Sequence, residues 1–331
     1  MCVLVLTSSP DPCVDLVARA IEEKGGRMVR LETGRFPTDA RLRFESAGTG
    51  RIDIDGASLS LAEISAVWNR HVEAGDGLPA DLDPMLRKAC RVQSRSALQS
   101  LTECLPVFQL DPLDVLQRAP SKPRQIQIAR SLGLDVPRTL LTNDPDAVRA
   151  FAAGCPTGLI TKMIDSSVWL ETGAGKKAIH TRTVEPEELA ALDGLSGLDL
   201  CPMLFQERVP KARELRITVV GSHLFAAAVD SSASVAGADD WRSDPALAES
   251  FRACDDLPET VRTRIFALLD RLGLNFATVD LIHTPEGRYV FLEVNTVSYF
   301  GFVECSAGLP ISAAVADLLL GRSAPRVKGT R

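Results

Sequence analysis

Three oxygen-bearing side chains stand out near the end of the chain, because they interrupt two apolar segments within residues 276–304. Glu293 and Asn295 are two residues apart, so on a β-strand their side chains leave the same face. The turn residues 284–287 predict an antiparallel hairpin that brings Asp280 opposite this segment. Two carboxylates and one amide oxygen form a hard ligand set, which suits Mg²⁺ shared with nucleotide phosphates. The alternative is that all three are ordinary surface positions on a hairpin.

Three cations upstream could serve the same site. Lys162 lies within the apolar segment 158–164, where an amine is costly unless its charge has a partner such as a polyphosphate. Lys122 comes at the start of a predicted helix, where the dipole favours anions, so a phosphate contact would explain it; a solvated surface lysine is the alternative. Arg216 shares a strand face with Glu214 and could present its guanidinium fork to phosphate or carboxylate oxygens. A plain cross-strand ion pair is the alternative for Arg216.

The extended segment 205–209 (FQERV) leaves a predicted strand and ends before Pro210. Such a segment can offer backbone N–H and C=O groups to the edge of an adenine base. The candidate nucleotide contacts here are Gln206, Glu207 and Val209. No Ser-His-Asp or Cys-His arrangement is evident in the sequence.

Composition and charge exclude several classes of protein. The 331 residues are 45% apolar and 24% charged, which is typical of a globular protein with two or three domains' worth of core. A net charge of −6 and few aromatic residues argue against nucleic-acid and membrane partners. The eight cysteines form no CxxC pair and the four histidines have no metal-like spacing, so we expect free thiols in a reducing cytoplasm and no zinc site. No stretch reaches the ~18 apolar residues of a membrane span, and the N-terminus fits a buried strand better than a signal peptide.

Apolar periodicity and turn residues predict an α/β (α+β) protein with a domain boundary near residues 112–120. The chain before this boundary begins with a strand–helix–strand unit, which indicates a parallel α/β domain. After it, residues 121–132 are predicted to form a helix, and hairpins are predicted at 214–229 and 276–294. The basic residues 322–331 are expected to be a disordered, solvated tail.

The order of these motifs resembles the nucleotide-binding elements of the ATP-grasp superfamily. The match covers residues 121–320 and runs through Lys122, Lys162, FQERV, Glu214-Leu215-Arg216, Asp280 and Glu293-Val294-Asn295. Within the superfamily the chain is most similar to the ribosomal peptide maturases known as graspetide (microviridin-type) macrocyclases. Five phrases carry this likeness over nearly the whole chain: VLVLTSSPDPCVDLVARAIEEKGGRMVRL, AVWNRH, KPRQIQIARSLGLDVPRTLLTNDP, KARELRITVVGSHLFAAAVDS and DWR.

The resemblance implies an ATP-grasp fold with a parallel α/β domain at residues 1–118, a small central α+β domain at 119–202 and a C-terminal antiparallel-sheet domain at 203–321. It also implies an ATP-dependent peptide macrocyclase with ATP and Mg²⁺ as cofactors and with Glu214 as a further nucleotide contact. Asp280, Glu293 and Asn295 would hold the metal, and Lys122 and Lys162 would neutralise the phosphates. A Glu or Asp side chain of a precursor peptide becomes an acyl phosphate, and a Ser or Thr hydroxyl or a Lys amine then displaces phosphate to give an ester or amide ring. Arg216 is the residue expected to stabilise the phosphate and the tetrahedral intermediate.

The precursor peptide, with its leader and core, is the partner that the resemblance implies. The family binds the leader near the hairpin at 214–229, and the neighbouring Lys211 and Arg213 suit an acidic peptide. Arg70 and Arg242 are candidates for holding core carboxylates. Each of these arginines has a solvated surface position as its alternative, and the sequence leaves open a homo-oligomer.

Two segments depart from the family pattern. Asn69, Arg70 and His71 follow Trp68 where the family usually has two arginines, and residues 296–300 (TVSYF) replace the usual Asn-Pro and Gly-Gln-Trp continuation.

The runner-up function is an ATP-grasp amino-acid or glutamate ligase acting on a small molecule or protein tail, which would share every ATP-binding residue. A non-catalytic ATP-binding regulatory module is the third hypothesis, and it predicts loss of a metal ligand or phosphate lysine, which the sequence does not show.

Overall fold

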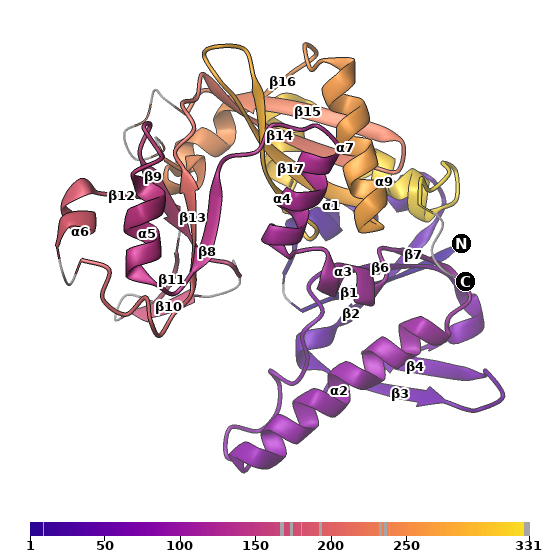
Figure 1. Cartoon of the computed structure of the whole chain (residues 1–331). Coiled ribbons are helices and arrows are strands. Elements are labelled where there is room, and N and C mark those ends of the chain that lie inside the picture. The colour runs from indigo at the N-terminus through magenta and orange to yellow at the C-terminus, as the bar shows by residue number, and fades with distance from the viewer. Residues whose placement is uncertain are drawn as a thin grey trace.

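A computed structural model of the chain describes residues 1–8, 10–165, 169–172, 175–179, 181–191, 194–231, 234, 237 and 239–327. Three sheet-based parts follow one another along the chain, from indigo through magenta to orange and yellow in Figure 1. Among the described residues, no helix combines the length and the apolarity needed to cross a membrane.

The N-terminal part is built on a parallel sheet with strand order β2-β1-β6-β7. Its strands are β1 (Cys2–Thr7), β2 (Arg27–Glu32), β6 (Ile64–Asn69) and β7 (Phe108–Leu110). Helix α1 (Pro12–Glu23) connects β1 to β2 and begins at Asp11, whose carboxylate accepts from the Cys13 backbone N–H. The long helix α2 (Pro84–Cys104) and a small antiparallel sheet complete this part; that sheet consists of β3 (Ala40–Phe44), β4 (Gly50–Ile54) and β5 (Ala57–Ser60).

The central part is an antiparallel sheet with strand order β12-β9-β13-β8. Its elements are β8 (Thr139–Thr142), α5 (Pro145–Ala152), β9 (Leu159–Lys162), β12 (Arg182–Val184), α6 (Pro186–Ala190) and β13 (Met203–Glu207), with a separate hairpin of β10 (Trp169–Thr172) and β11 (Gly175–Ala178). Val148, Leu159 and Phe205 belong to its own small core, and Figure 1 shows this part standing apart on the left.

The C-terminal part is a five-stranded antiparallel sheet with strand order β16-β15-β14-β17-β18. Its strands are β14 (Arg213–Val220), β15 (His223–Val229), β16 (Arg252–Ala253), β17 (Phe276–His283) and β18 (Tyr289–Asn295), and its helices are α7 (Glu259–Leu272), α8 (Gly301–Ala307) and α9 (Ile311–Leu319). Helices α3 (Leu113–Arg118) and α4 (Lys122–Ser131) connect it to the N-terminal part, and α4 packs against β18 and α7.

One hydrophobic core joins the N-terminal and C-terminal parts. Val5 on β1 and Val17 on α1 belong to the same buried cluster as Val315 on α9 and Phe276 on β17. Helix α1 packs directly on α9, although about 300 residues separate them in sequence. The N-terminal and C-terminal sheets therefore share one hydrophobic core, while the central sheet has a separate core.

The predicted α/β (α+β) fold class is confirmed, with the parallel, small central and antiparallel sheets in the expected order. The domain boundaries at 118/119 and 202/203 stay a prediction. The short elements α3, α8 and β16 were not predicted, because each is too short to show a full period of apolar residues.

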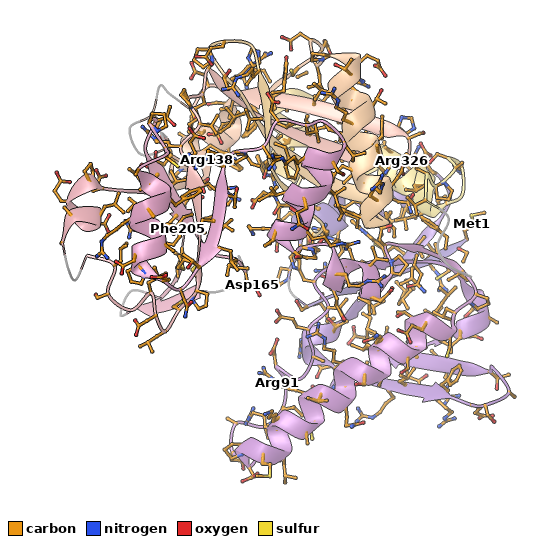
Figure 2. The ribbon with its side chains drawn as sticks, in the orientation of Figure 1. Met1, Arg91, Arg138, Asp165, Phe205 and Arg326 are labelled. Atoms are coloured by element: carbon orange, nitrogen blue, oxygen red, sulfur yellow. The ribbon has the colours of Figure 1, made fainter. Side chains whose placement is uncertain are left out.

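The expectation of a solvated tail at 322–331 is wrong for its described part. Arg326 donates to the carbonyls of Phe266, Leu274 and Gly221, and it lies against α7 in Figure 2. It also pairs with Asp270, with 2.8 Å between the charged atoms. A basic composition alone could not reveal that the carbonyls of Leu274 and Gly221, just beyond the ends of α7 and β14, and that of Phe266 within α7 accept from this side chain. Residues 328–331 lie outside the described residues.

A buried carboxylate, Asp111, ties the chain after β7 to the start of β17. It accepts from the backbone N–H groups of Asn275 and Phe276 at 2.9 to 3.0 Å, and from the Asn275 amide at 3.2 Å. Burial raises the pKa of Asp111 to about 7, although these donors lower it.

The raised pKa predicts a pH-dependent stability. An Asp111 carboxyl with a pKa of about 7 when folded and 3.8 when unfolded binds its proton more tightly in the folded protein. Its contribution to stability is therefore complete below about pH 4 and is lost as the pH rises to about 7. Between these pH values the free energy of unfolding of the wild type should fall by about 2–4 kcal/mol relative to that of Asp111→Asn. Urea unfolding of both proteins across this range checks it, and parallel pH profiles would contradict it.

Candidate active site

The β17–β18 hairpin brings the predicted metal ligands together. Asp280 pairs with Glu293 across the two strands, and Thr278 pairs with Asn295, with a bulge directly after Asp280. The Asn295 amide nitrogen lies 2.8 Å from an Asp280 oxygen and 3.4 Å from a Glu293 oxygen. The expected convergence of the three side chains is therefore present, within a hairpin whose turn falls at residues 284–288.

Asp280 and Glu293 are both buried, with 8% of each residue exposed. Their surroundings shift the two pKa values in opposite directions. Burial raises the pKa of Asp280 to about 6, although the Arg216 guanidinium lowers it. Burial also opposes the charge of Glu293, but Lys162, Arg242 and Lys122 outweigh it and hold the pKa of Glu293 well below its usual range. Glu293 is thus a permanent anion among cations.

The donor set fits Mg²⁺ rather than a transition metal. In the described part of the chain, no three residues of the types His, Cys, Asp and Glu form a group that could hold a metal. Mg²⁺ does not require one, because one or two carboxylates plus substrate phosphates are its usual ligands in proteins. Asp280 and Glu293 supply the carboxylates, and a half-turn of the Asn295 amide about its last bond would present an oxygen on the same side.

Three cations surround Glu293. Lys122, the first residue of α4, lies 3.5 Å from a Glu293 oxygen and donates to the Ile164 carbonyl at 3.1 Å. Lys162 ends β9 on the central sheet, and burial lowers its pKa although Glu293 opposes this. Arg242 lies 3.6 Å from the other Glu293 oxygen. Three cations around one anion can accept further negative charge, as the phosphates of a nucleotide would supply.

Arg216 on β14 faces the same carboxylates. Its Nη1 donates to both oxygens of Asp280, at 3.0 and 3.3 Å, and its Nη2 donates to the Ser298 hydroxyl at 2.6 Å. The rings of Trp241 and Phe302 lie 5.5 Å from its guanidinium carbon. Among the described residues its buried Nε has no hydrogen-bond partner. The cross-strand ion pair that was the alternative for Arg216 exists, with Asp280 as its partner, but it leaves the Nε donor of the guanidinium unused.

A pocket opens between the central sheet and the hairpin. Its lining includes five of the predicted nucleotide contacts and both metal carboxylates: Lys162, Gln206, Glu207, Val209, Glu214, Asp280 and Glu293. Pro137, Ile160, Ile282 and Leu292 supply apolar walls. An apolar wall next to a charged end suits a base and its phosphates. Lys122, Arg216 and Asn295 are outside the lining but contact its two carboxylates.

Two residues of the pocket were missed as site residues. Asp240 accepts from Arg242 at 2.8 and 3.0 Å and so orients the guanidinium toward Glu293. Trp241 lines the pocket and covers Arg216. The Asp-Trp-Arg run was visible in the sequence, but its acid and its aromatic residue carried no separate spacing signal.

The prediction that Arg70 holds core carboxylates is wrong for this structure. Its side chain has no exposed surface, because Nε and Nη2 both donate to Asp11 and Nη1 donates to the Ser298 carbonyl. A guanidinium that is closed off and already paired cannot take up a peptide carboxylate. The sequence showed that Arg70 follows a strand. It did not show that Asp11, at the start of α1, is the ion-pair partner of Arg70.

The basic residues expected to bind the peptide are also paired. Lys211 lies 2.7 Å from a Glu214 oxygen, and Arg213 lies 2.6 Å from an Asp256 oxygen. The hydrogen bond that Arg213 donates to the Asp256 carboxylate raises the pKa of Arg213. The hairpin at 214–229 forms the strands β14 and β15, which have partners on both sides within the five-stranded sheet. β14 is paired along its length on both sides, whereas β16 pairs only with Ala227 and Ala228 of β15, so the outer edge of β15 is covered over part of its length.

Known proteins are similar to this chain over most of its length. A family model described as the MvdD pre-ATP grasp domain matches residues 2–117. The macrocyclase MdnC from Microcystis aeruginosa MRC, solved with the precursor peptide MdnA, is 36% identical, with 97% of this chain and 100% of that chain covered and a TM-score of 0.86. A RiPP-associated ATP-grasp ligase from Chryseobacterium gregarium, solved with ADP and a leader and core peptide, is 28% identical, with coverage of 100% and 99% and a TM-score of 0.91. A probable alpha-L-glutamate ligase from Enterobacter sp. (strain 638) is 26% identical over 226 residues, which are 67% of this chain and 71% of that protein.

The fold, the pocket and these relatives define the class: the chain is an ATP-grasp ligase. Identity of 36% with MdnC over nearly both whole chains is specific enough to go one step further. The chain belongs to the ATP-grasp macrocyclase family that matures ribosomal peptides, which confirms the resemblance found in the sequence.

The charge pattern predicts a metal-dependent effect of Glu293→Gln. With Mg²⁺ present, the variant should bind ADP at least about 10-fold more weakly, because a metal ligand is lost. Without Mg²⁺ it should bind ADP as well as or better than the wild type, because an anion beside the phosphates is removed. Isothermal titration calorimetry with and without a chelator checks both signs. Glu286→Gln, on the exposed turn of the same hairpin, serves as the control and should change neither affinity. Equal weakening of Glu293→Gln in both conditions would contradict the metal assignment.

Proposed function

We propose that this ligase is a macrocyclase that joins side chains within one ribosomally made precursor peptide. The observation that carries the ATP-dependent step of the proposal is the pair of buried carboxylates, Asp280 and Glu293, set among Lys122, Lys162 and Arg242 at the charged end of one pocket. The 36% identity with a macrocyclase solved with its precursor peptide supports the choice of substrate.

The nucleotide and the metal would be divided between the two sheets. We assign Mg²⁺ to Asp280, Glu293 and Asn295, where its charge would offset that of the phosphates and polarise the transferred phosphoryl group. A relative of 28% identity solved with ADP supports a nucleotide as the ligand of this site. Lys122 and Lys162 would bind the phosphates. The nucleoside would contact Gln206, Glu207, Val209 and Glu214, which also line the pocket.

The reaction that this site would serve has two balanced steps. In the first, an oxygen of a peptide Glu or Asp carboxylate attacks the γ-phosphorus of ATP, the bond to the β-phosphate bridging oxygen breaks, and ADP leaves. In the second, a Ser or Thr hydroxyl or a Lys amine attacks the acyl carbon, gives up its proton, and phosphate leaves. Arg216 is our choice for stabilising the charge on the phosphate and on the tetrahedral intermediate, with its Nε as the unused donor.

The peptide would approach from the rim of this pocket. Arg242, with 39% of its side chain exposed, is the candidate for orienting a core carboxylate. Lys211 and Arg213 would contact the leader by exchanging their present partners, Glu214 and Asp256. Eight free cysteines suit a reducing compartment, so we place the reaction in the cytoplasm, where ATP and newly made peptides are available.

A glutamate ligase is the second candidate, because curated relatives at 26% identity carry that name. It would use the same nucleotide site and differ only in the acceptor. Mass spectrometry of the product separates the two functions.

Incubation with ATP, Mg²⁺ and a neighbouring small peptide rich in Thr and Glu or Asp tests the proposal. Macrocyclisation removes one water per ring, so the peptide mass should fall by about 18 Da for each ring formed, from the formula of the condensation. A peptide whose Glu and Asp are replaced by Gln and Asn should keep its mass, because it has no carboxylate to activate. A mass increase by an added amino acid would replace the proposal by the glutamate-ligase alternative.

A further inference from the structure

We infer that Ser298 is a positioning residue, which holds Arg216 in place and is itself anchored by Arg70 to the N-terminal part. The inference rests on the proposed function, since it concerns how Arg216 is kept ready for the transferred phosphoryl group. It assigns a role to a segment, residues 296–300, that departs from the family pattern.

Ser298 contacts two guanidinium groups through two different atoms. Its hydroxyl accepts from Arg216 Nη2 at 2.6 Å, and its backbone carbonyl accepts from Arg70 Nη1 at 3.1 Å. The serine is 5% exposed and the two arginines are 7% and 2% exposed. Ser298 therefore joins a residue of β14, in the C-terminal sheet, to one that follows β6, in the N-terminal sheet.

Arg70, at the N-terminal side of this connection, is held by several contacts. Arg70 donates twice to Asp11, which also caps α1, and neither side chain has exposed surface. The Arg70 guanidinium lies 5.1 Å from the centre of the Trp68 ring. The ring of His71, the residue after Arg70, stacks on the ring of Tyr299, with 5.4 Å between the ring centres. The two segments that depart from the family pattern thus contact each other at two neighbouring positions.

The chemistry of the two anchors of Arg216 differs. Asp280 is a proposed metal ligand, so its hold on the guanidinium competes with its hold on the metal. The Ser298 hydroxyl is neutral and outside the ligand set. It fixes the direction of the guanidinium without neutralising its charge, which leaves that charge available for phosphate oxygens. Ser298 is therefore the anchor that persists when Asp280 binds a cation.

Substitution of the hydroxyl alone tests the inference. Ser298→Ala should lower kcat for ADP formation by about 10- to 100-fold, since loss of one oriented charge near the reacting atoms typically costs this much or more. The KM for ATP should change by less than about three-fold, because the phosphate lysines remain. Ser298→Thr keeps the hydroxyl and should restore at least about a third of the wild-type kcat.

Ser312→Ala is the matched control. It removes another buried hydroxyl of the same C-terminal part, which is 8% exposed and donates to Glu304. Among the hydrogen bonds and ion pairs of the described residues, neither Ser312 nor Glu304 is joined to Arg216. Its kcat should stay within about two-fold of the wild type. A Ser298→Ala protein that behaves like Ser312→Ala in kcat would overturn the inference, as would a fall in kcat that Ser298→Thr shares.

The two proposals fail separately in this design. ADP release is common to macrocyclases and glutamate ligases, so the Ser298 comparison remains valid if product mass excludes macrocyclisation. Crystal structures of the wild type and Ser298→Ala, both with ADP and Mg²⁺ bound so that Asp280 is engaged by the metal, give a readout independent of turnover. The Arg216 guanidinium should move away from its position near Asp280 in the variant, and an unchanged guanidinium would overturn the inference even if the wild type showed no turnover.

Discussion

The pairing of buried charges is the constraint on which the rest of the structure depends. Asp280 and Glu293 lie inside an antiparallel sheet, and removing one partner of such a pair typically costs about 3–5 kcal/mol. Each acid has its cations: Arg216 for Asp280, and Lys122, Lys162 and Arg242 for Glu293. Apolar residues of similar volume would often be as stable, so stability does not explain the arrangement. The arrangement is explained by the ligands proposed for it, Mg²⁺ and the phosphates of ATP.

The same constraint accounts for how the three parts are assembled. The cations around Glu293 come from different elements: Lys122 from α4, Lys162 from β9 in the central sheet, and Arg242 from the segment after β15. The site is complete only when these elements meet at the β17–β18 hairpin. The N-terminal sheet shares a core with the C-terminal sheet and adds the Arg70–Asp11 pair behind the site. It thus acts as a support for the chemistry rather than as a separate module.

Local patterns in the sequence were enough for the architecture and for the hairpin with Asp280, Glu293 and Asn295, because register follows from a turn and a period of two. The lysines were identifiable because a charge is costly in an apolar strand or at a helix start. Partners distant in sequence could not be predicted in the same way. Arg70 and Asp11 are 59 residues apart, and Arg216 and Ser298 are 82 apart, with no shared periodicity to connect them. Arg70 was therefore wrongly predicted to be accessible to a peptide, and Ser298 was not recognised as a partner of Arg216.

Locating the metal and the nucleotide tests the central claim most directly. A crystal of the protein with ADP and Mn²⁺ in place of Mg²⁺ gives an anomalous signal that identifies the ion. The account predicts an Mn²⁺ peak between the carboxylates of Asp280 and Glu293, with the ADP phosphates in contact with Lys122 and Lys162. An Mn²⁺ peak elsewhere, or ADP bound outside the pocket between the central sheet and the β17–β18 hairpin, would contradict it.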